Sequence, residues 1–149
     1  MTSDEVGRFL AEQPIVILAT LGRDGWPHVT PLWYVMRAGE PWIFTYAGSQ
    51  KVRNLERDPR ATLLVETGGT YGDLRGVMIV AHAEIDRDPD TVGSLADELL
   101  ARYAGGDQGT WIDERTRRAV RDRAAKRVAV RFRSERVVSW DHSKLGGGY

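Results

Sequence analysis

Apolar residues recur along most of the chain in short runs of strand length. The run "IVILATL" is almost continuously apolar and rich in β-branched residues, which is typical of a strand buried on both faces. Near the C-terminus Val128, Val130 and Phe132 alternate with Arg131 and Arg133, the pattern of a strand with one buried face. We expect six strands, at residues 15–21, 28–36, 41–47, 61–66, 75–85 and 127–140.

Helical patterns are fewer and mostly lie between these runs. Thr2 and Glu5 have the spacing of a capping box, and Pro14 ends the pattern, so a helix is expected over residues 3–13. A second, short helix is expected within residues 49–60. Two more are predicted later in the chain, by an apolar stripe of Leu95, Leu99, Leu100 and Tyr103 and by a charged segment at residues 113–126.

The order of these elements predicts a mainly β fold. The first five strands follow one another with short connections, so neighbouring strands are expected to pair antiparallel. A small barrel closes such a sheet without leaving exposed edges. At 149 residues the chain is expected to form a single domain, residues 1–149.

Charge and composition exclude several classes of function. The 21 basic residues equal the 21 acidic ones, so no overall field attracts nucleic acid, which we do not expect as a partner. The chain has no cysteine, and no apolar run has the length of a membrane span. Its acidic N-terminus lacks a signal-peptide pattern, so a cytoplasmic location is expected. The three histidines show no metal-ligand spacing, and no metal site is predicted.

The segment "SQKVRNLERDPR", residues 49–60, is the first candidate for chemistry. Ser49 is a good N-cap residue, and Asp58 followed by Pro59 ends the helix. A helix that starts directly after a strand presents free backbone N–H groups, here those of Gln50 and Lys51. These groups and the helix dipole favour an anion at this position.

The helical repeat assigns the side chains of this segment to faces. With Val52 and Leu55 on the buried side, Lys51 lies about 70° from the buried direction, whereas Arg53 and Asn54 lie about 130° away on opposite flanks. Asn54 shares the side of Lys51, and Arg53 points elsewhere. The chain uses three lysines against eighteen arginines, which favours a specific use of Lys51 as a compact point charge. Ordinary solvated charges on a surface helix are the alternative.

The hairpin before this helix concentrates aromatic side chains. Pro31 interrupts a strand-like run and is tolerated chiefly at an edge strand or bulge, where backbone groups remain available to a ligand. The aromatic residues can flank a flat ring, although the core is the more ordinary place for any one of them. They are Trp33, Tyr34, Trp42, Phe44 and Tyr46.

The sequence shows no serine in a nucleophile-elbow context and no conspicuous carboxylate pair. If the chain is an enzyme, a bound cofactor is therefore expected to supply the difficult chemistry.

Three segments, "ILATLGRDGWPHVTPLWYV", "WIFTYAGSQKVRNLERDPRATLLVE" and "RGVMIVAHAEI", resemble the pyridoxamine-5′-phosphate-oxidase-like split-barrel superfamily, and within it the actinobacterial flavin/deazaflavin oxidoreductases. The resemblance covers roughly residues 10–140. It implies a six-stranded antiparallel split β-barrel and a homodimer with cofactor sites between the subunits. It also implies that the cofactor phosphate lies at Ser49, Gln50 and Lys51 with Asn54 nearby. The cofactor ring is expected along His28, Val29, Thr30, Pro31, Leu32 and Trp33.

Departures from the family pattern shape the expected activity. True pyridoxamine phosphate oxidases carry an arginine and a lysine where this chain has Val29 or Thr30 and Tyr34, and their Ser-Arg-Lys is here Ser49-Gln50-Lys51. Oxidation of vitamin B6 is therefore not expected. Fewer fixed cations favour F420, whose negative charge is spread along its length, over the dianionic phosphate of FMN.

The expected function is hydride transfer from reduced F420 to a planar organic acceptor. An FMN-dependent oxidase or reductase is the second hypothesis, and a protein that binds or carries the cofactor without turnover is the third. The arginines at 53, 57 and 60 are expected to meet the F420 tail or to form a solvated face. Trp140 and Lys144 are expected to contact the cofactor of the partner subunit, with a frayed terminus as the alternative.

Overall fold

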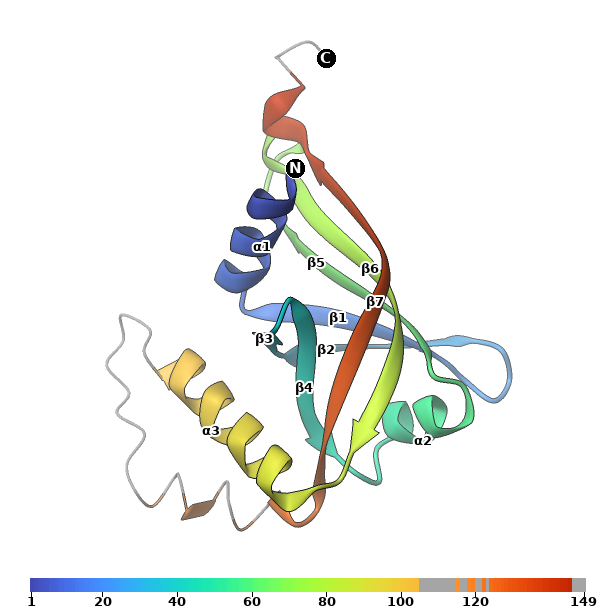
Figure 1. The fold of residues 1–149 in the computed structure, drawn as a ribbon. Coiled ribbons are helices and arrows are strands. Elements are labelled where there is room, and N and C mark those ends of the chain that lie inside the picture. Colours follow the sequence, from blue (N-terminus) through green and yellow to red (C-terminus); the bar gives the residue numbers. More distant parts are fainter. Residues whose placement is uncertain (105–114, 116–117, 120–121, 123, 146–149) are drawn as a thin grey trace.

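The computed structural model describes residues 1–104, 115, 118–119, 122 and 124–145 (Figure 1). The strands of this part are β1 (Ile15–Leu21), β2 (Pro27–Trp33), β3 (Val35–Arg37), β4 (Glu40–Tyr46), β5 (Arg60–Thr67), β6 (Arg75–Asp86) and β7 (Arg127–Asp141). The helices are α1 (Ser3–Glu12), α2 (Gln50–Arg57) and α3 (Pro89–Ala104), with short 3₁₀ turns η1 (Tyr71–Asp73) and η2 (His142–Lys144).

The described strands form one antiparallel sheet of seven strands in the order β2-β1-β5-β6-β7-β4-β3. The mainly β, antiparallel architecture is as predicted, but the number of strands is seven and not six. The strand expected over residues 28–36 is broken at Tyr34. The backbone N–H of Tyr34 donates to the Tyr103 hydroxyl at 3.1 Å, and its carbonyl accepts from that hydroxyl at 3.0 Å, so neither group pairs with a strand.

The break at Tyr34 divides the predicted hairpin between two partners. β2 pairs with β1, and only β3 pairs with β4. Although β2 and β3 are adjacent in the chain, they therefore lie at opposite ends of the strand order. The sheet curls until β2 and β4 are in contact, but these two strands share no ladder (Figure 1). The barrel is therefore split along this line, and Pro31 lies on the edge strand β2, where a proline is tolerated.

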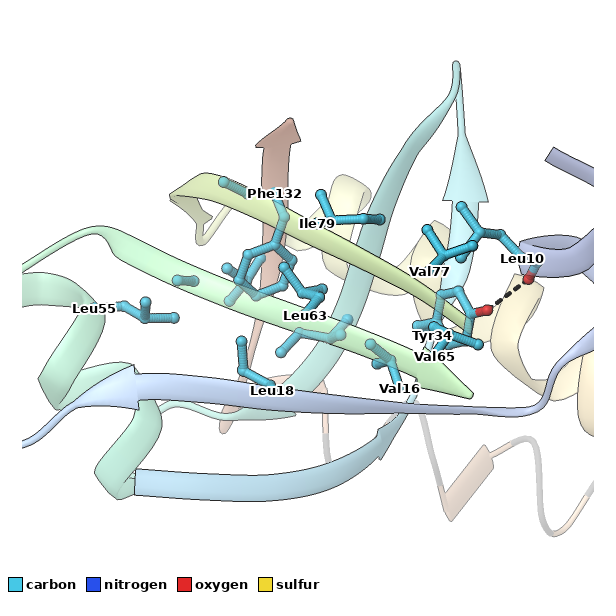
Figure 2. Packing of buried hydrophobic residues seen from close by; sticks show 14 of the residues in the cluster. Leu10, Val16, Leu18, Tyr34, Leu55, Leu63, Val65, Val77, Ile79 and Phe132 are labelled. Carbon is cyan, nitrogen blue, oxygen red and sulfur yellow. Dashed lines mark hydrogen bonds between the residues drawn. The ribbon is translucent and has the colours of Figure 1, made fainter. Parts of the chain in front are cut away.

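Alternating side chains of the curled sheet fill the barrel interior (Figure 2). Leu18, Leu63 and Phe132 have no exposed surface, and they meet across β1, β5 and β7. Helix α1 closes one end of this core, where the Tyr34 hydroxyl donates to the carbonyl oxygen of Leu10 at 2.6 Å. Helix α3 packs outside the barrel, with Leu95 and Leu99 against Ala129 of β7. Of the charged helix predicted over residues 113–126, the structure describes residues 115, 118–119, 122 and 124–126, and the remaining positions lie outside the described residues.

Helix α1 has the predicted capping box. Glu5 N–H donates to the Thr2 hydroxyl at 3.3 Å, and the Glu5 carboxylate accepts from the Thr2 N–H at 2.6 Å. The same carboxylate accepts from Lys144 Nζ of η2 at 2.6 and 2.7 Å. The ammonium of Lys144, together with the Thr2 N–H, lowers the pKa of Glu5 to about 2. This pair fastens η2, and with it the end of β7, to the N-terminal helix.

The lowered pKa of Glu5 makes the stability of the fold depend on pH. Because the folded pKa lies below the ordinary value, the contribution of this group is present above about pH 4.5 and is lost as the pH falls towards 2. The unfolding free energy of the wild type is expected to fall between pH 6 and pH 3, and in Glu5→Gln this fall should be smaller. Urea denaturation at the two pH values measures both. Asp4→Asn, at the exposed neighbouring position, is the control and should keep the wild-type difference. Identical pH dependence in Glu5→Gln and wild type would show that the pair contributes nothing.

Candidate functional site

A cavity of about 470 Å³ lies at the split of the barrel, between the edge strand β2, strand β4 and helix α3. Its volume is within the range of pockets that hold cofactors and small molecules. The lining is apolar apart from one cation, Arg127, at the start of β7. Three residues expected to lie along the cofactor ring, Pro31, Leu32 and Trp33, line it. We call this cavity the split groove; its other lining residues are Ile15, Phe44, Ala96, Leu99 and Leu100.

Trp33 forms a flat wall of the split groove. Its indole stacks on the Tyr103 ring with the centroids 4.5 Å apart and the planes 7° from parallel. The single proton of the Tyr103 hydroxyl is shared between the carbonyl oxygens of Pro14 at 2.6 Å and Tyr34 at 3.0 Å, and the hydroxyl oxygen accepts from the Tyr34 N–H at 3.1 Å. Tyr103 is thereby held in place and fixes the plane of Trp33, while 55% of Trp33 stays exposed. An indole held in this way offers a surface on which a flat ring can stack.

The start of α2 contains a buried hydroxyl that has no partner. Ser49 occupies the predicted N-cap position, but its side chain makes no capping hydrogen bond. Its Oγ is buried and has no hydrogen-bond partner in the described chain. Buried polar atoms are normally satisfied, so an orphaned hydroxyl beside free helix amides fits a site for an anionic oxygen.

Lys51 and Arg127 place two positive charges beside this helix start. Lys51 is half-buried, and burial, with a further contribution from the nearby charge of Arg127, lowers the pKa of its ammonium. The guanidinium of Arg127 lies 5.3 Å from the centroid of the Phe44 ring. Within the described residues neither side chain makes a hydrogen bond or ion pair. Because Arg127 lines the split groove and its charge acts on Lys51, the anion site predicted at Lys51 adjoins this groove.

His28 and Gln50 line a second hollow of about 540 Å³ between α2 and the β1–β2 turn. The Nδ1 of His28 is buried and has no partner in the described chain, and the same holds for the Oγ1 of Thr30, two residues along β2. Both side chains are on the half-buried face of β2, whereas Val29 is 56% exposed on the opposite face. The structure therefore divides the expected ring-binding residues between an inner and an outer face of one strand.

Asn54 is buried, which its angle on the helix did not indicate. The helical repeat placed it on an open flank, but the side chain has no exposed surface. Its Nδ2 donates to the Thr20 hydroxyl at 3.0 Å, and its Oδ1 accepts from Gln50 Nε2 at 2.9 Å and from Arg57 at 3.5 Å. The flank was not expected to be buried, because the contact with β1 depends on tertiary packing that angles within the helix do not reveal. In this structure Asn54 links α2 to β1, and its role towards a cofactor stays a prediction.

Trp140 and Lys144, expected to reach the partner's cofactor, both have contacts within their own chain. Trp140 lies over Gly76 of β6, so closely that a Cβ added to Gly76 would meet the indole at 2.2 Å. Lys144 pairs with Glu5. Contact with a partner subunit stays a prediction for both residues.

Three further contributors to the site were not selected from the sequence. Phe44 was counted only among aromatic residues of a hairpin, Tyr103 only as part of an apolar stripe, and Arg127 as the first residue of a strand. Arg127 reaches the site because it pairs with Tyr46 of β4 in the sheet register. No local pattern carries this signal, since the pairing joins segments that are far apart in the sequence.

Other kinds of site have little support in the described part of the chain. Residues 1–104, 115, 118–119, 122 and 124–145 contain no group of three or more side chains suited to hold a metal ion. Among the same residues, no helix has the length and apolar character needed to cross a membrane. The split groove and the adjoining cations are therefore the best-supported candidate, and their flat wall, orphaned hydroxyl and unpaired charges fit a planar cofactor with an anionic group.

Comparison with known proteins identifies solved structures that share this fold. A structure of the conserved hypothetical protein Rv2991 from Mycobacterium tuberculosis is 39% identical, with a TM-score of 0.87 over 100% of this chain and 90% of that one. A structure described as an F420 reductase is 24% identical, with a TM-score of 0.64 over 87% of this chain and 93% of that one. The heme storage protein HutZ from Vibrio cholerae is 16% identical, with a TM-score of 0.67 over 91% of this chain and 92% of that one.

The last two similarities, at under 25% identity, establish a shared fold. The family is established by a model described as pyridoxamine 5′-phosphate oxidase, which matches residues 2–141, nearly the whole chain. With the split barrel, the groove beside β2 and the cations at the start of α2, the match leads to one conclusion: this chain belongs to the pyridoxamine 5′-phosphate oxidase family.

Proposed function

We propose that the chain is an oxidoreductase that binds F420 and transfers hydride from the reduced cofactor to a planar organic acceptor. The observation that carries this proposal is the position of two unpaired cations, Lys51 and Arg127, beside an apolar groove with a flat aromatic wall. The family match and the fold shared with an F420 reductase support the choice of a flavin-type cofactor.

The residues divide into three groups in this proposal. The N–H groups of Gln50 and Lys51, the Lys51 ammonium and the Ser49 hydroxyl hold the phosphate at the start of α2. Trp33, stacked on Tyr103, orients the ring against β2, and Leu32 and Phe44 exclude water from the groove. His28 and Thr30, with their unpaired polar atoms on the inner face of β2, supply hydrogen bonds to polar groups of the cofactor.

When bound, F420 would supply a hydride, that is one proton with two electrons, and the acceptor would take its second hydrogen as a proton. No acidic or histidine side chain is among the groove-lining residues in the described chain. We therefore assign the proton to water, and the protein's contribution to binding, orientation and shielding.

Titration of the purified protein with F420, followed by cofactor fluorescence, tests the proposal. We expect saturable binding with a dissociation constant in the micromolar range or below, and oxidation of the reduced cofactor when a quinone, nitro-aromatic or tetrapyrrole acceptor is added. Binding no tighter than millimolar would remove F420 from consideration.

FMN is the alternative cofactor within the same groove. Two cations, Lys51 and Arg127, match the charge of a phosphate monoester at neutral pH. A protein that is yellow on purification, with the absorbance of a flavin, would favour FMN. Tight binding of either cofactor without reduction of any acceptor would instead favour a carrier, a possibility in keeping with the fold shared with a heme storage protein.

We further propose a homodimer formed through the outer face of the sheet. The register aligns an apolar row across five strands on this face, in the order Pro31, Ile17, Leu64, Met78 and Val138. Val138, at one end of the row, is 42% exposed. At the other end, Val29 and Trp33, which lie on either side of Pro31 on the same face of β2, are more than half exposed. An apolar row of this length on an open sheet is typical of a protein–protein interface.

Val138→Glu is expected to convert the dimer to a monomer, because it places a charge within the apolar row. The mass of the purified protein, measured by light scattering after size exclusion, reports the change. Val137→Glu is the matched control, since Val137 is also exposed but lies on the opposite side of β7. If both variants keep the mass of the wild type, or if the wild type is already a monomer, this face is not the interface.

A further inference from the structure

Arg102 docks the last turn of α3 against the end of α1. Its Nη2 lies 2.7 Å from the carbonyl oxygen of Gln13, 2.9 Å from that of Ala11 and 3.2 Å from that of Leu10, so its two hydrogens are shared among three acceptors. Carbonyl groups at the end of a helix have no partner within the helix, and they favour a positive charge. The last turn of α1 contains no basic residue, and Arg102 supplies this charge from another helix.

The same guanidinium lies over two aromatic rings. It is 4.7 Å from the centroid of the Tyr34 ring and 5.5 Å from that of the Tyr103 ring. A cation in this position is attracted to the face of the ring. Tyr34 is fully buried, and its hydroxyl donates to the Leu10 carbonyl oxygen that Arg102 also reaches. Arg102 therefore holds Tyr103 against a side chain that is fixed in the core.

Tyr103 links Arg102 to the wall of the split groove. Its ring stacks on the Trp33 indole with the centroids 4.5 Å apart and the planes 7° from parallel. In the described chain neither Arg102 nor Tyr103 is among the residues that line the split groove, whereas Trp33 is. An occupant of the groove therefore meets the indole, and the two residues behind it determine how firmly the indole is held.

Helix α3 is attached to the barrel at a second point. Arg37 of β3 donates to the two carboxylate oxygens of Glu98 at 2.9 and 2.8 Å, and to the Ser94 hydroxyl at 2.9 Å. Arg37 and Arg102 thus dock the same helix, and of the two it is Arg102 that lies over the Tyr103 ring. The two links allow the positioning of the indole to be separated from the general stabilisation of α3.

We infer that Arg102 is a positioning residue of the split groove: acting through Tyr103, it holds the Trp33 indole in the orientation on which a planar ring stacks. A side chain that is fixed before binding loses no further conformational freedom when the ligand arrives. A fixed indole therefore raises the affinity for a planar ring, although Arg102 itself does not contact the ligand. The inference rests on the proposed function only for the identity of the ring.

Fluorine NMR of the protein labelled with 5-fluorotryptophan reports the setting of Trp33, whose signal is assigned with Trp33→Phe. In Arg102→Met, which keeps the aliphatic stem but removes the guanidinium, we expect this signal to shift towards that of free 5-fluorotryptophan, because the indole loses its fixed stack. Arg102→Lys keeps the charge without the planar fork, and should move the signal in the same direction by less. Arg37→Met is the matched control and should leave the signal unchanged. Circular dichroism and the melting temperature check that each variant is folded.

Fluorescence titration with F420, FMN and riboflavin measures the consequence for binding. Arg102→Met is expected to weaken the binding of each ring by about threefold to tenfold, the range for immobilising one or two side chains on binding. Riboflavin is neutral, so a loss with this probe does not come from the removed charge. Arg37→Met should bind within about twofold of the wild type.

The two measurements separate the inference from the proposed function. If the Trp33 signal moves in Arg102→Met as expected but none of the three rings binds to the wild type, the positioning of Trp33 stands and the proposed function fails. If the signal is unchanged in Arg102→Met, or moves equally in Arg37→Met, Arg102 only docks α3 and the inference is wrong. A displaced signal with unchanged affinity for a ring that does bind would also overturn it. Should Arg102→Met be unfolded, the same criteria apply to Arg102→Lys.

Discussion

Lys51→Ala is expected to weaken cofactor binding by about tenfold to a hundredfold, the range expected for the loss of one charge-assisted contact to phosphate. The fold should be unaffected, because Lys51 makes no ion pair or hydrogen bond to the described chain and its neighbours Val52 and Leu55 anchor the helix in the core. Fluorescence titration with F420, and with FMN as the alternative, measures the change.

Arg53→Ala is the control for Lys51→Ala. Both substitutions remove one positive charge from α2, but the Arg53 side chain is exposed and lies away from the split groove. Its effect on affinity should be no more than about twofold, and it should decrease further as salt is added. Equal losses in the two variants would mean that the helix acts only through its total charge, and that the assigned faces have no part in binding.

Asn54→Ala is expected to lower the unfolding free energy by about 2–4 kcal/mol. The substitution removes a fully buried side chain and leaves the hydroxyl of Thr20, itself 3% exposed, without the donor that it now has at 3.0 Å. Urea denaturation followed by circular dichroism measures the loss.

Gln50→Ala is the matched control for Asn54→Ala, because it removes another partner in the same network from an exposed position. It should cost less than about 1 kcal/mol. If Asn54→Ala is as stable as the wild type but has lost affinity for the cofactor, Asn54 is a ligand and its link to β1 is incidental. A loss of stability with cofactor affinity unchanged, measured well below the melting temperature, assigns it to the fold.

Much of the strand pattern could be predicted, because it depends on near neighbours in the chain. Alternation at Val128, Val130 and Phe132 indicated which side of β7 is buried, and all three are buried with at most 1% exposed. The capping box at Thr2 and Glu5 was also predicted and is present. The break at Tyr34 was not, since it depends on a hydroxyl from α3 that takes the place of a neighbouring strand.

The candidate site was predictable only in part. The start of α2 could be located because a strand followed by a good N-cap residue is a local signal. The burial of Asn54 was not predicted, because the helical repeat gives angles within a helix but does not reveal that β1 packs against a second side. Arg127 was missed, since its relation to Lys51 comes from the register of β4 with β7.

The sequence by itself therefore determined the strands, the mainly β class and the place where an anion is expected, since each depends on residues a few positions apart. The tertiary structure alone decided how the site is assembled. The curling of the sheet brought β2 near β4 and opened the split groove, Tyr103 fixed the plane of Trp33, and strand pairing placed Arg127 beside Lys51. The physical reason is that such contacts join segments distant in the chain, and the packing of the whole sheet selects which of them form.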